Sequence, residues 1–174
     1  TEADIHLSID SDIVGFTPED TLKMCESVEE YGIVGGSYVC RSPVRTFPAT
    51  FYEDGIRVEH SFDHTPVKVK WLATGFMAVH RRVFEKLAEN LTLLHRSEGQ
   101  RAFYNFYQPF EYEDEDTGEP ILLSEDYAFC QRAKDAGFDS YVDPAVRLGH
   151  VGSYIYRLED TAQNEFPARP LALT

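Results

Sequence analysis

Hydrophobic and polar positions alternate at the start of the chain in a pattern that predicts a strand, a helix and a second strand. Residues 4–9 alternate and then run apolar, which predicts a buried strand that delivers Asp10 at its carboxyl end. Residues 18–30 have helical spacing after a Thr-Pro start signal, and residues 33–39 form the next strand pattern. This succession predicts a βαβ unit and an α/β fold with a mostly parallel central sheet flanked by helices.

The middle of the chain changes to shorter patterns. An Asp-Gly pair between β-prone flanks predicts a hairpin over residues 51–58. Residues 67–79 alternate as a strand that is interrupted at Gly75, and residues 81–94 have helical spacing. Residues 99–120 are rich in aromatic and acidic side chains and predict a functional loop or a short hairpin.

The last third predicts one more helix and two extended segments. Ser124 is a candidate N-cap for a helix that ends at Gly137. A strand is expected from Tyr141, followed by a turn at Asp143-Pro144 and a further extended segment over 146–150. The pattern fades after about residue 156, so we expect one domain over 1–156 and a tail over 157–174.

The net charge of the chain limits the classes of partner that it is expected to bind. The 174 residues include 30 acidic and 16 basic side chains, for a net charge of −14. Binding to a nucleic-acid backbone needs a basic face, so no nucleic-acid partner is expected. An anionic substrate would need local positive charge, which a divalent cation supplies economically.

The cysteines and the hydropathy of the chain indicate the cellular compartment of the protein. The three cysteines have no metal-ligand spacing, and no apolar run approaches the length of a membrane span. Sparse, isolated cysteines are typical of reduced thiols. The sequence therefore predicts a cytoplasmic protein without a membrane span.

Two acidic motifs are candidates for chemistry. Asp10-Ser11-Asp12 follows the first strand, where an Asp-x-Asp pair suits a hard divalent cation that also binds diphosphate oxygens. A solvated turn explains the same residues. In Ser124-Glu125-Asp126 one acid is a candidate general base, although serine followed by acids is also what a helix N-terminus prefers.

Two glycine-flanked positions are weaker candidates. His150 lies between Gly149 and Gly152, where it is either a structural histidine or a metal ligand. Thr74-Gly75 is either a strand bulge or a backbone wall against a bound sugar or phosphate. Local sequence does not separate these alternatives.

Taken in order, the four motifs resemble the core of GT-A fold glycosyltransferases, and especially the small viral, phage and bacterial enzymes that use nucleotide sugars. Such enzymes carry a DxD motif, a glycine loop, an xED motif and a C-terminal metal-binding histidine. The corresponding segments are Ile9-Asp10-Ser11-Asp12, Thr74-Gly75-Phe76-Met77, Ser124-Glu125-Asp126-Tyr127-Ala128-Phe129-Cys130 and Gly149-His150-Val151-Gly152.

The resemblance implies a metal-dependent transferase that moves a sugar from a nucleoside-diphosphate sugar to a hydroxyl of a glycan or another acceptor, with inversion favoured. It implies Mn²⁺ or Mg²⁺ held by Asp10, Asp12 and His150. Asp126 would be the general base, and Glu125 would hold a sugar hydroxyl or the base. The implied donor-binding residues are Asp10, Ser11, Asp12, Thr74 and Gly75.

The chain departs from that family at its start. A complete GT-A domain carries nucleotide-binding strands before the DxD motif, and these are missing here, so a partial chain is expected. Two alternatives stay open. One is a non-catalytic module that binds a metal or a glycan on the same scaffold, and the other is a sugar nucleotidyltransferase.

Overall fold

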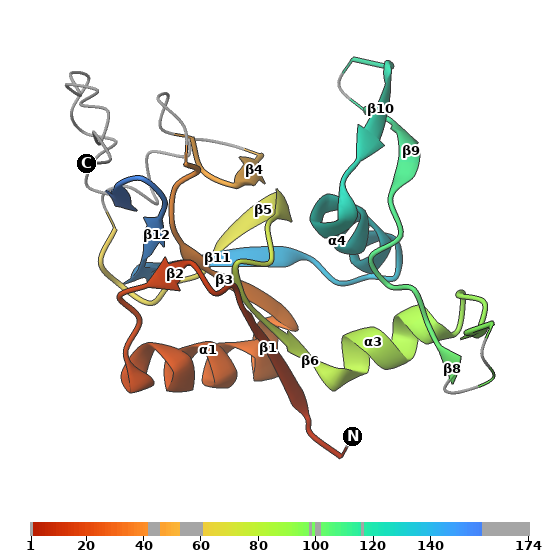
Figure 1. Ribbon diagram of the computed structural model, residues 1–174, viewed down its shortest axis with the longest axis horizontal. Helices are drawn as coiled ribbons and strands as arrows, with labels where there is room; N and C mark the ends of the chain where they lie inside the picture. Colours follow the sequence, from red (N-terminus) through yellow and green to blue (C-terminus); the bar gives the residue numbers. More distant parts are fainter. Residues whose placement is uncertain are drawn as a thin grey trace.

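The chain folds around a six-stranded sheet (Figure 1). The computed structural model describes residues 2–41, 46–52, 61–97, 99, 102–115 and 117–157. The sheet order is β1-β6-β3-β11-β5-β4. The strands are β1 (Ile5–Ile9), β3 (Ile33–Ser37), β4 (Ala49–Phe51), β5 (Val67–Leu72), β6 (Phe76–His80) and β11 (Ser140–Arg147).

The sheet is mixed, which corrects the expectation of a mostly parallel one. Among the described strands, β3 and β11 form a parallel pair, and the other four neighbouring pairs are antiparallel. The helix between β1 and β3 does keep these two strands parallel, but β6 inserts between them and pairs antiparallel with both. The strand–helix–strand pattern thus predicted the directions of β1 and β3 and not their neighbours.

Strand β1 lies at the edge of the sheet, and this corrects the prediction of a buried strand. Its residues are half-buried or exposed, including Ile9. Because β1, β3 and β11 run in the same direction, the segments that follow them emerge at one edge of the sheet. Asp10, Tyr38 and His150 lie in these segments, at the position where open α/β sheets bind ligands.

Helix α1 (Pro18–Tyr31) covers one face of the sheet. Met24 and Val28 are fully buried in a cluster with Val34, Phe76 and Ala78 from β3 and β6. The helix begins as predicted, with a capping box in which Thr17 and Asp20 exchange hydrogen bonds of 3.1 and 2.7 Å with each other's backbone N–H.

Replacing Thr17 by alanine should lower the free energy of unfolding by about 1 kcal/mol, because the first turn loses its side-chain acceptor. Chemical denaturation measures the change. Thr17→Ser keeps the hydroxyl and is the control, so an equal loss in both variants would show that the cap is not the cause.

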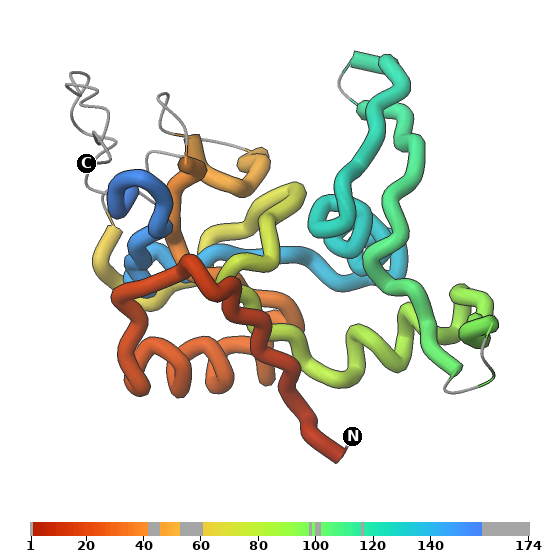
Figure 2. Tube along the Cα trace, viewed as in Figure 1, coloured from red at the N-terminus to blue at the C-terminus, as the bar shows by residue number. Residues whose placement is uncertain are grey.

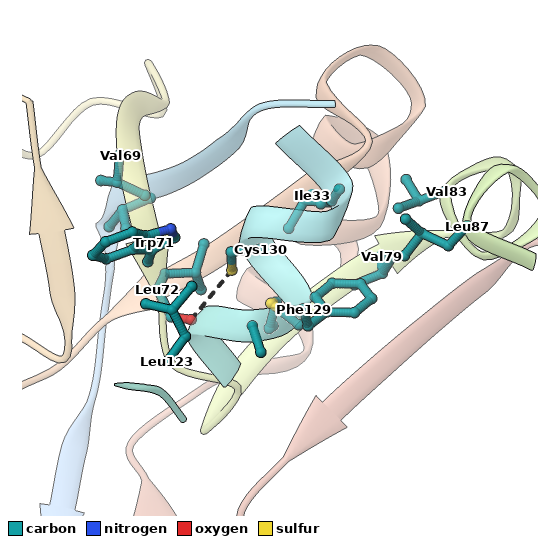
Figure 3. Packing of buried hydrophobic residues seen from close by; sticks show 14 of the residues in the cluster. Ile33, Val69, Trp71, Leu72, Val79, Val83, Leu87, Leu123, Phe129 and Cys130 are labelled. Atoms are coloured by element: carbon teal, nitrogen blue, oxygen red, sulfur yellow. Dashed lines mark hydrogen bonds between the residues drawn. The ribbon is translucent and has the colours of Figure 1, made fainter. Parts of the chain in front are cut away.

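Helices α3 (Arg81–Ala88) and α4 (Glu125–Asp135) contribute to the core on the other face (Figure 3). Phe129 and Cys130 of α4 are fully buried against β5 and β6, and the Cys130 thiol donates to the Leu72 carbonyl at 3.4 Å. Burial raises the pKa of this thiol to about 11. None of the described helices combines the length and apolar character needed to cross a membrane.

Smaller sheets lie beside the six-stranded sheet. β12 (Gly149–Val151) pairs with β13 (Ile155–Arg157) and with β2 (Ile13–Val14), so the turn after β1 lies beside the last described strands, red next to blue in Figure 2. β9 (Phe110–Glu113) and β10 (Pro120–Leu123) form a hairpin, so the hairpin alternative for residues 99–120 holds for its first strand, while the second strand continues to Leu123. β7 (Leu94–His95) pairs with β8 (Ala102–Phe103).

Two further predictions have clear outcomes, and two others lie largely outside the described residues. The interruption at Gly75 is confirmed, since β5 and β6 are separate strands. The turn at Asp143-Pro144 is wrong, because β11 runs through both residues and changes its register with β3 beyond Asp143. The hairpin at 51–58 falls largely on residues 53–60 and the tail on residues 158–174, which lie outside the described residues.

Candidate functional site

The Asp10-Ser11-Asp12 segment forms a tight turn that is fixed at both ends. The Ile13 amide donates to the Asp10 carbonyl at 3.0 Å, and the Asp10 amide donates to the Gly75 carbonyl at 2.9 Å. The Val151 amide donates to the Asp12 carbonyl at 2.8 Å. The turn is therefore held by the start of β6 on one side and by β12 on the other, and this fixes where its two carboxylates lie.

Three carboxylates meet at one cavity of about 370 Å³. Asp10 comes from the end of β1, and Glu125 and Asp126 come from the first turn of α4. The same cavity is lined by His6, Ser8, Thr74 and Tyr107. The structure thus brings Asp10 together with Glu125 and Asp126, which lie more than a hundred residues away in the sequence.

Asp126 is held from outside its own helix. Its Oδ1 accepts a hydrogen bond from the Thr74 hydroxyl at 2.8 Å. Burial is the main cause that raises the pKa of Asp126; hydrogen bonds from Thr74 oppose the rise, and the charges of Glu125 and Asp10 add to it. Ser124 occupies the N-cap position but makes no side-chain capping hydrogen bond.

Asp12 and His150 form a second group at the same edge. His150 Nε2 lies 3.6 Å from Asp12 Oδ2, and an Arg41 guanidinium nitrogen lies 2.9 Å from the same oxygen. His150 Nδ1 lies 3.0 Å from the Val39 carbonyl. A carbonyl only accepts, so Nδ1 carries a proton, and Nε2 is the ring nitrogen that faces Asp12.

This second group partly fits a divalent cation. A carboxylate oxygen and an imidazole nitrogen that face each other are suitable ligand types, and a backbone carbonyl on the other ring nitrogen is the usual way to fix such a histidine. Within the described ranges, no three His, Cys, Asp or Glu side chains are close enough to hold a metal by themselves. Any cation would therefore need further ligands from a bound diphosphate or water.

The two groups are connected by Tyr38, which the sequence did not indicate. Its hydroxyl accepts the Gly75 amide proton at 3.0 Å, and its ring meets the His150 ring edge-on at 5.5 Å. Burial raises the pKa of this hydroxyl, as do the charges of Asp126 and Asp10. The only available signal for Tyr38 was its position in the segment at the carboxyl end of the predicted strand 33–39.

Tyr38 also explains Gly75. A Cβ placed on Gly75 would lie 2.4 Å from the Tyr38 hydroxyl oxygen and 2.8 Å from its ring carbon Cζ. The missing side chain therefore accommodates Tyr38, at a position where the sequence left open a strand bulge or a wall against a bound sugar or phosphate. Thr74 lines the cavity and donates to Asp126, and Ser11 is exposed in the turn, so donor binding by these two residues stays a prediction.

Gly75→Ala should lower the free energy of unfolding by about 1–3 kcal/mol, because the new methyl group overlaps Tyr38. Tyr38→Phe should cost a similar amount by leaving the Gly75 amide without its acceptor. Since both changes act on one contact, the double variant should lose clearly less than the sum. Additive losses in chemical denaturation would contradict this account of Gly75.

Comparisons with known proteins leave the function open. No protein-family model matches the chain, and no curated protein matches it. A similar solved structure is the crystal structure of A197 from STIV, with a TM-score of 0.49 and 14% sequence identity over 95% of this chain and 69% of that chain. A likeness this distant carries no weight for function, which rests on the geometry of the site.

Proposed function

We propose that the protein is a metal-dependent glycosyltransferase that uses a nucleoside-diphosphate sugar, with Asp126 as general base. The observation that carries this proposal is the cavity where Asp10, Glu125 and Asp126 meet. A carboxylate that is partly buried beside two others, and that is held by Thr74 rather than used as a cap, is typical of a catalytic base.

Each residue has a role in this proposal. Asp12 and His150 would hold Mn²⁺ or Mg²⁺ together with oxygens of the bound diphosphate. Asp10, which the resemblance groups with them, lines the Asp126 cavity instead. When bound, the cation would act as a Lewis acid that offsets charge on the leaving diphosphate. Arg41, which now neutralises Asp12, would remain close to the same phosphates.

The proposed reaction takes place at the cavity, where Asp126 acts as the base. Asp126 takes the proton of the acceptor hydroxyl while the acceptor oxygen forms a bond to the anomeric carbon. The bond from that carbon to the phosphate oxygen breaks, and its electron pair leaves with the nucleoside diphosphate. Glu125, which is exposed at the same cavity, is placed to accept a hydrogen bond from a sugar hydroxyl.

The test is release of nucleoside diphosphate from a panel of UDP- and GDP-sugars with Mn²⁺ and with EDTA. We expect release only with the metal, through slow hydrolysis without acceptor and faster transfer with one. Metal-dependent nucleotide binding without any release would favour the non-catalytic module. Release of pyrophosphate from a nucleoside triphosphate and a sugar phosphate would instead indicate a sugar nucleotidyltransferase.

A further inference from the structure

A second cavity adjoins the catalytic one. It has a volume of about 600 Å³ and lies between the edge strand β1, helix α3 and the segment before β9. His6 and Tyr107 line both cavities. The two cavities therefore adjoin at these two side chains, and we call the second one the aromatic groove.

Packed aromatic rings form the wall of the aromatic groove. The Phe84 ring meets His6 at 5.7 Å and Phe106 at 5.1 Å between ring centroids, both edge-on. Tyr107 stacks on the fully buried Phe129 at 4.7 Å and an interplanar angle of 16°. Because Phe84 also packs on Phe129, at 5.6 Å, the half-buried rings of Phe84 and Tyr107 are fixed before any ligand binds. The His6 ring is exposed.

The charges around the groove disfavour an anionic ligand. Arg81 is engaged by its own neighbours, since its Nε donates to the Ala3 carbonyl at 2.8 Å and lies 3.9 Å from Asp4. Glu85 adds a carboxylate to the wall, and the catalytic cavity adds three more. Carboxylates only accept hydrogen bonds, so they suit a neutral ligand with many hydroxyl donors.

We propose that the aromatic groove binds the acceptor as a neutral oligosaccharide of at least two sugars. The reacting hydroxyl lies at Asp126, and the following sugar rings lie against Tyr107, Phe84 and Phe106. Sugar rings present apolar C–H faces to aromatic rings and hydroxyls to carboxylates, which matches this wall. The proposal rests on the proposed transferase function, because only that function makes Asp126 the reacting end.

The test is binding of an array of neutral glycans of one to six sugars without donor, followed by calorimetry on the best series. We expect affinity to rise from one sugar to at least two. Phe106→Ala should weaken the longer glycans by about tenfold, as expected for one aromatic contact, and leave the monosaccharide unchanged. Phe62→Ala removes an exposed ring that is not among the groove residues and is the matched control.

The proposal would be overturned if the protein bound no neutral glycan, or if its affinity did not depend on glycan length. It would also be overturned if the protein preferred anionic glycans or phospholipid-linked sugars, or if Phe62→Ala lost as much affinity as the groove variant. Phe106→Leu replaces Phe106→Ala if thermal melting shows that the alanine variant unfolds. Binding of UDP or GDP with Mn²⁺ is measured on the same samples. Nucleotide binding without glycan binding rejects the groove alone, and length-dependent glycan binding without nucleotide binding rejects the transferase.

Discussion

Replacing Asp126 by asparagine is expected to slow glycosyl transfer by about 10²- to 10⁴-fold, the usual contribution of a general base. Asparagine keeps an oxygen that can accept from the Thr74 hydroxyl, so the cavity should keep its shape, and the Kd of the nucleotide with Mn²⁺ should not change. Steady-state kinetics and calorimetry measure the two quantities. Glu19→Gln makes the same kind of change in the first turn of α1 and should leave both unaltered.

The same substitution should stabilise the fold. Because burial raises the pKa of Asp126, its charged form is disfavoured in the folded protein. The protonated form therefore adds to the free energy of unfolding below the ordinary aspartate pKa, and this contribution is lost as pH rises through the raised pKa. Asparagine removes this cost, so at neutral pH the variant should be more stable, by about 1 kcal/mol as is common for active-site residues. The gain should disappear in acid. A loss of stability at neutral pH would instead make Asp126 a structural residue.

The raised pKa of Asp126 also determines the pH at which activity falls in acid. Transfer needs the charged form of Asp126, so kcat/KM should fall as pH decreases through a value above the ordinary aspartate range. A profile that stays flat down to the ordinary aspartate pKa would remove Asp126 from the role of base.

Asp12→Ala is expected to weaken Mn²⁺-dependent binding of UDP or GDP by at least about 100-fold, since loss of even an indirect partner of a metal ligand costs 10–100-fold. The fold should change little, because the ion pair with Arg41 is partly exposed to solvent and such pairs contribute about 0–1 kcal/mol. Calorimetry with and without EDTA makes the measurement. His150→Ala should give the same loss.

A matched carboxylate outside the site distinguishes metal binding from a general charge effect. Asp139 pairs with Lys68 in an ion pair of similar exposure, so Asp139→Ala removes one negative charge and one ion pair without touching the site. Its nucleotide affinity should equal that of the wild type. If Asp12→Ala binds metal and nucleotide as well as Asp139→Ala, the assignment of Asp12 is wrong.

Residues that follow strands could be predicted from sequence because strand ends are marked locally. The apolar run before Asp10 and the helix start after Ser124 each placed a carboxylate at the end of an element. The sequence could not show that β6 lies between β1 and β3, because neighbours in a sheet depend on contacts between distant residues. The parallel prediction failed at this step.

Local sequence patterns also could not predict which residues contact each site residue. Thr74 bonds to Asp126 and Tyr38 bonds to Gly75, and both contacts depend on where the β5–β6 connection meets α4 and the end of β3. Arg41 lies beside Asp12 for the same kind of reason. Glycine at position 75 was visible in the sequence, but the tyrosine that requires it was not.

The central claim is that the Asp12–His150 pair and the Asp126 cavity belong to one active site on either side of Tyr38. The most direct measurement is an anomalous difference map from crystals soaked with Mn²⁺ and UDP or GDP. The account predicts a manganese peak within coordination distance of Asp12 and His150, with the diphosphate on the side of the cavity lined by Asp10 and Asp126. A peak elsewhere, or a nucleotide that points away from Asp126, would contradict it.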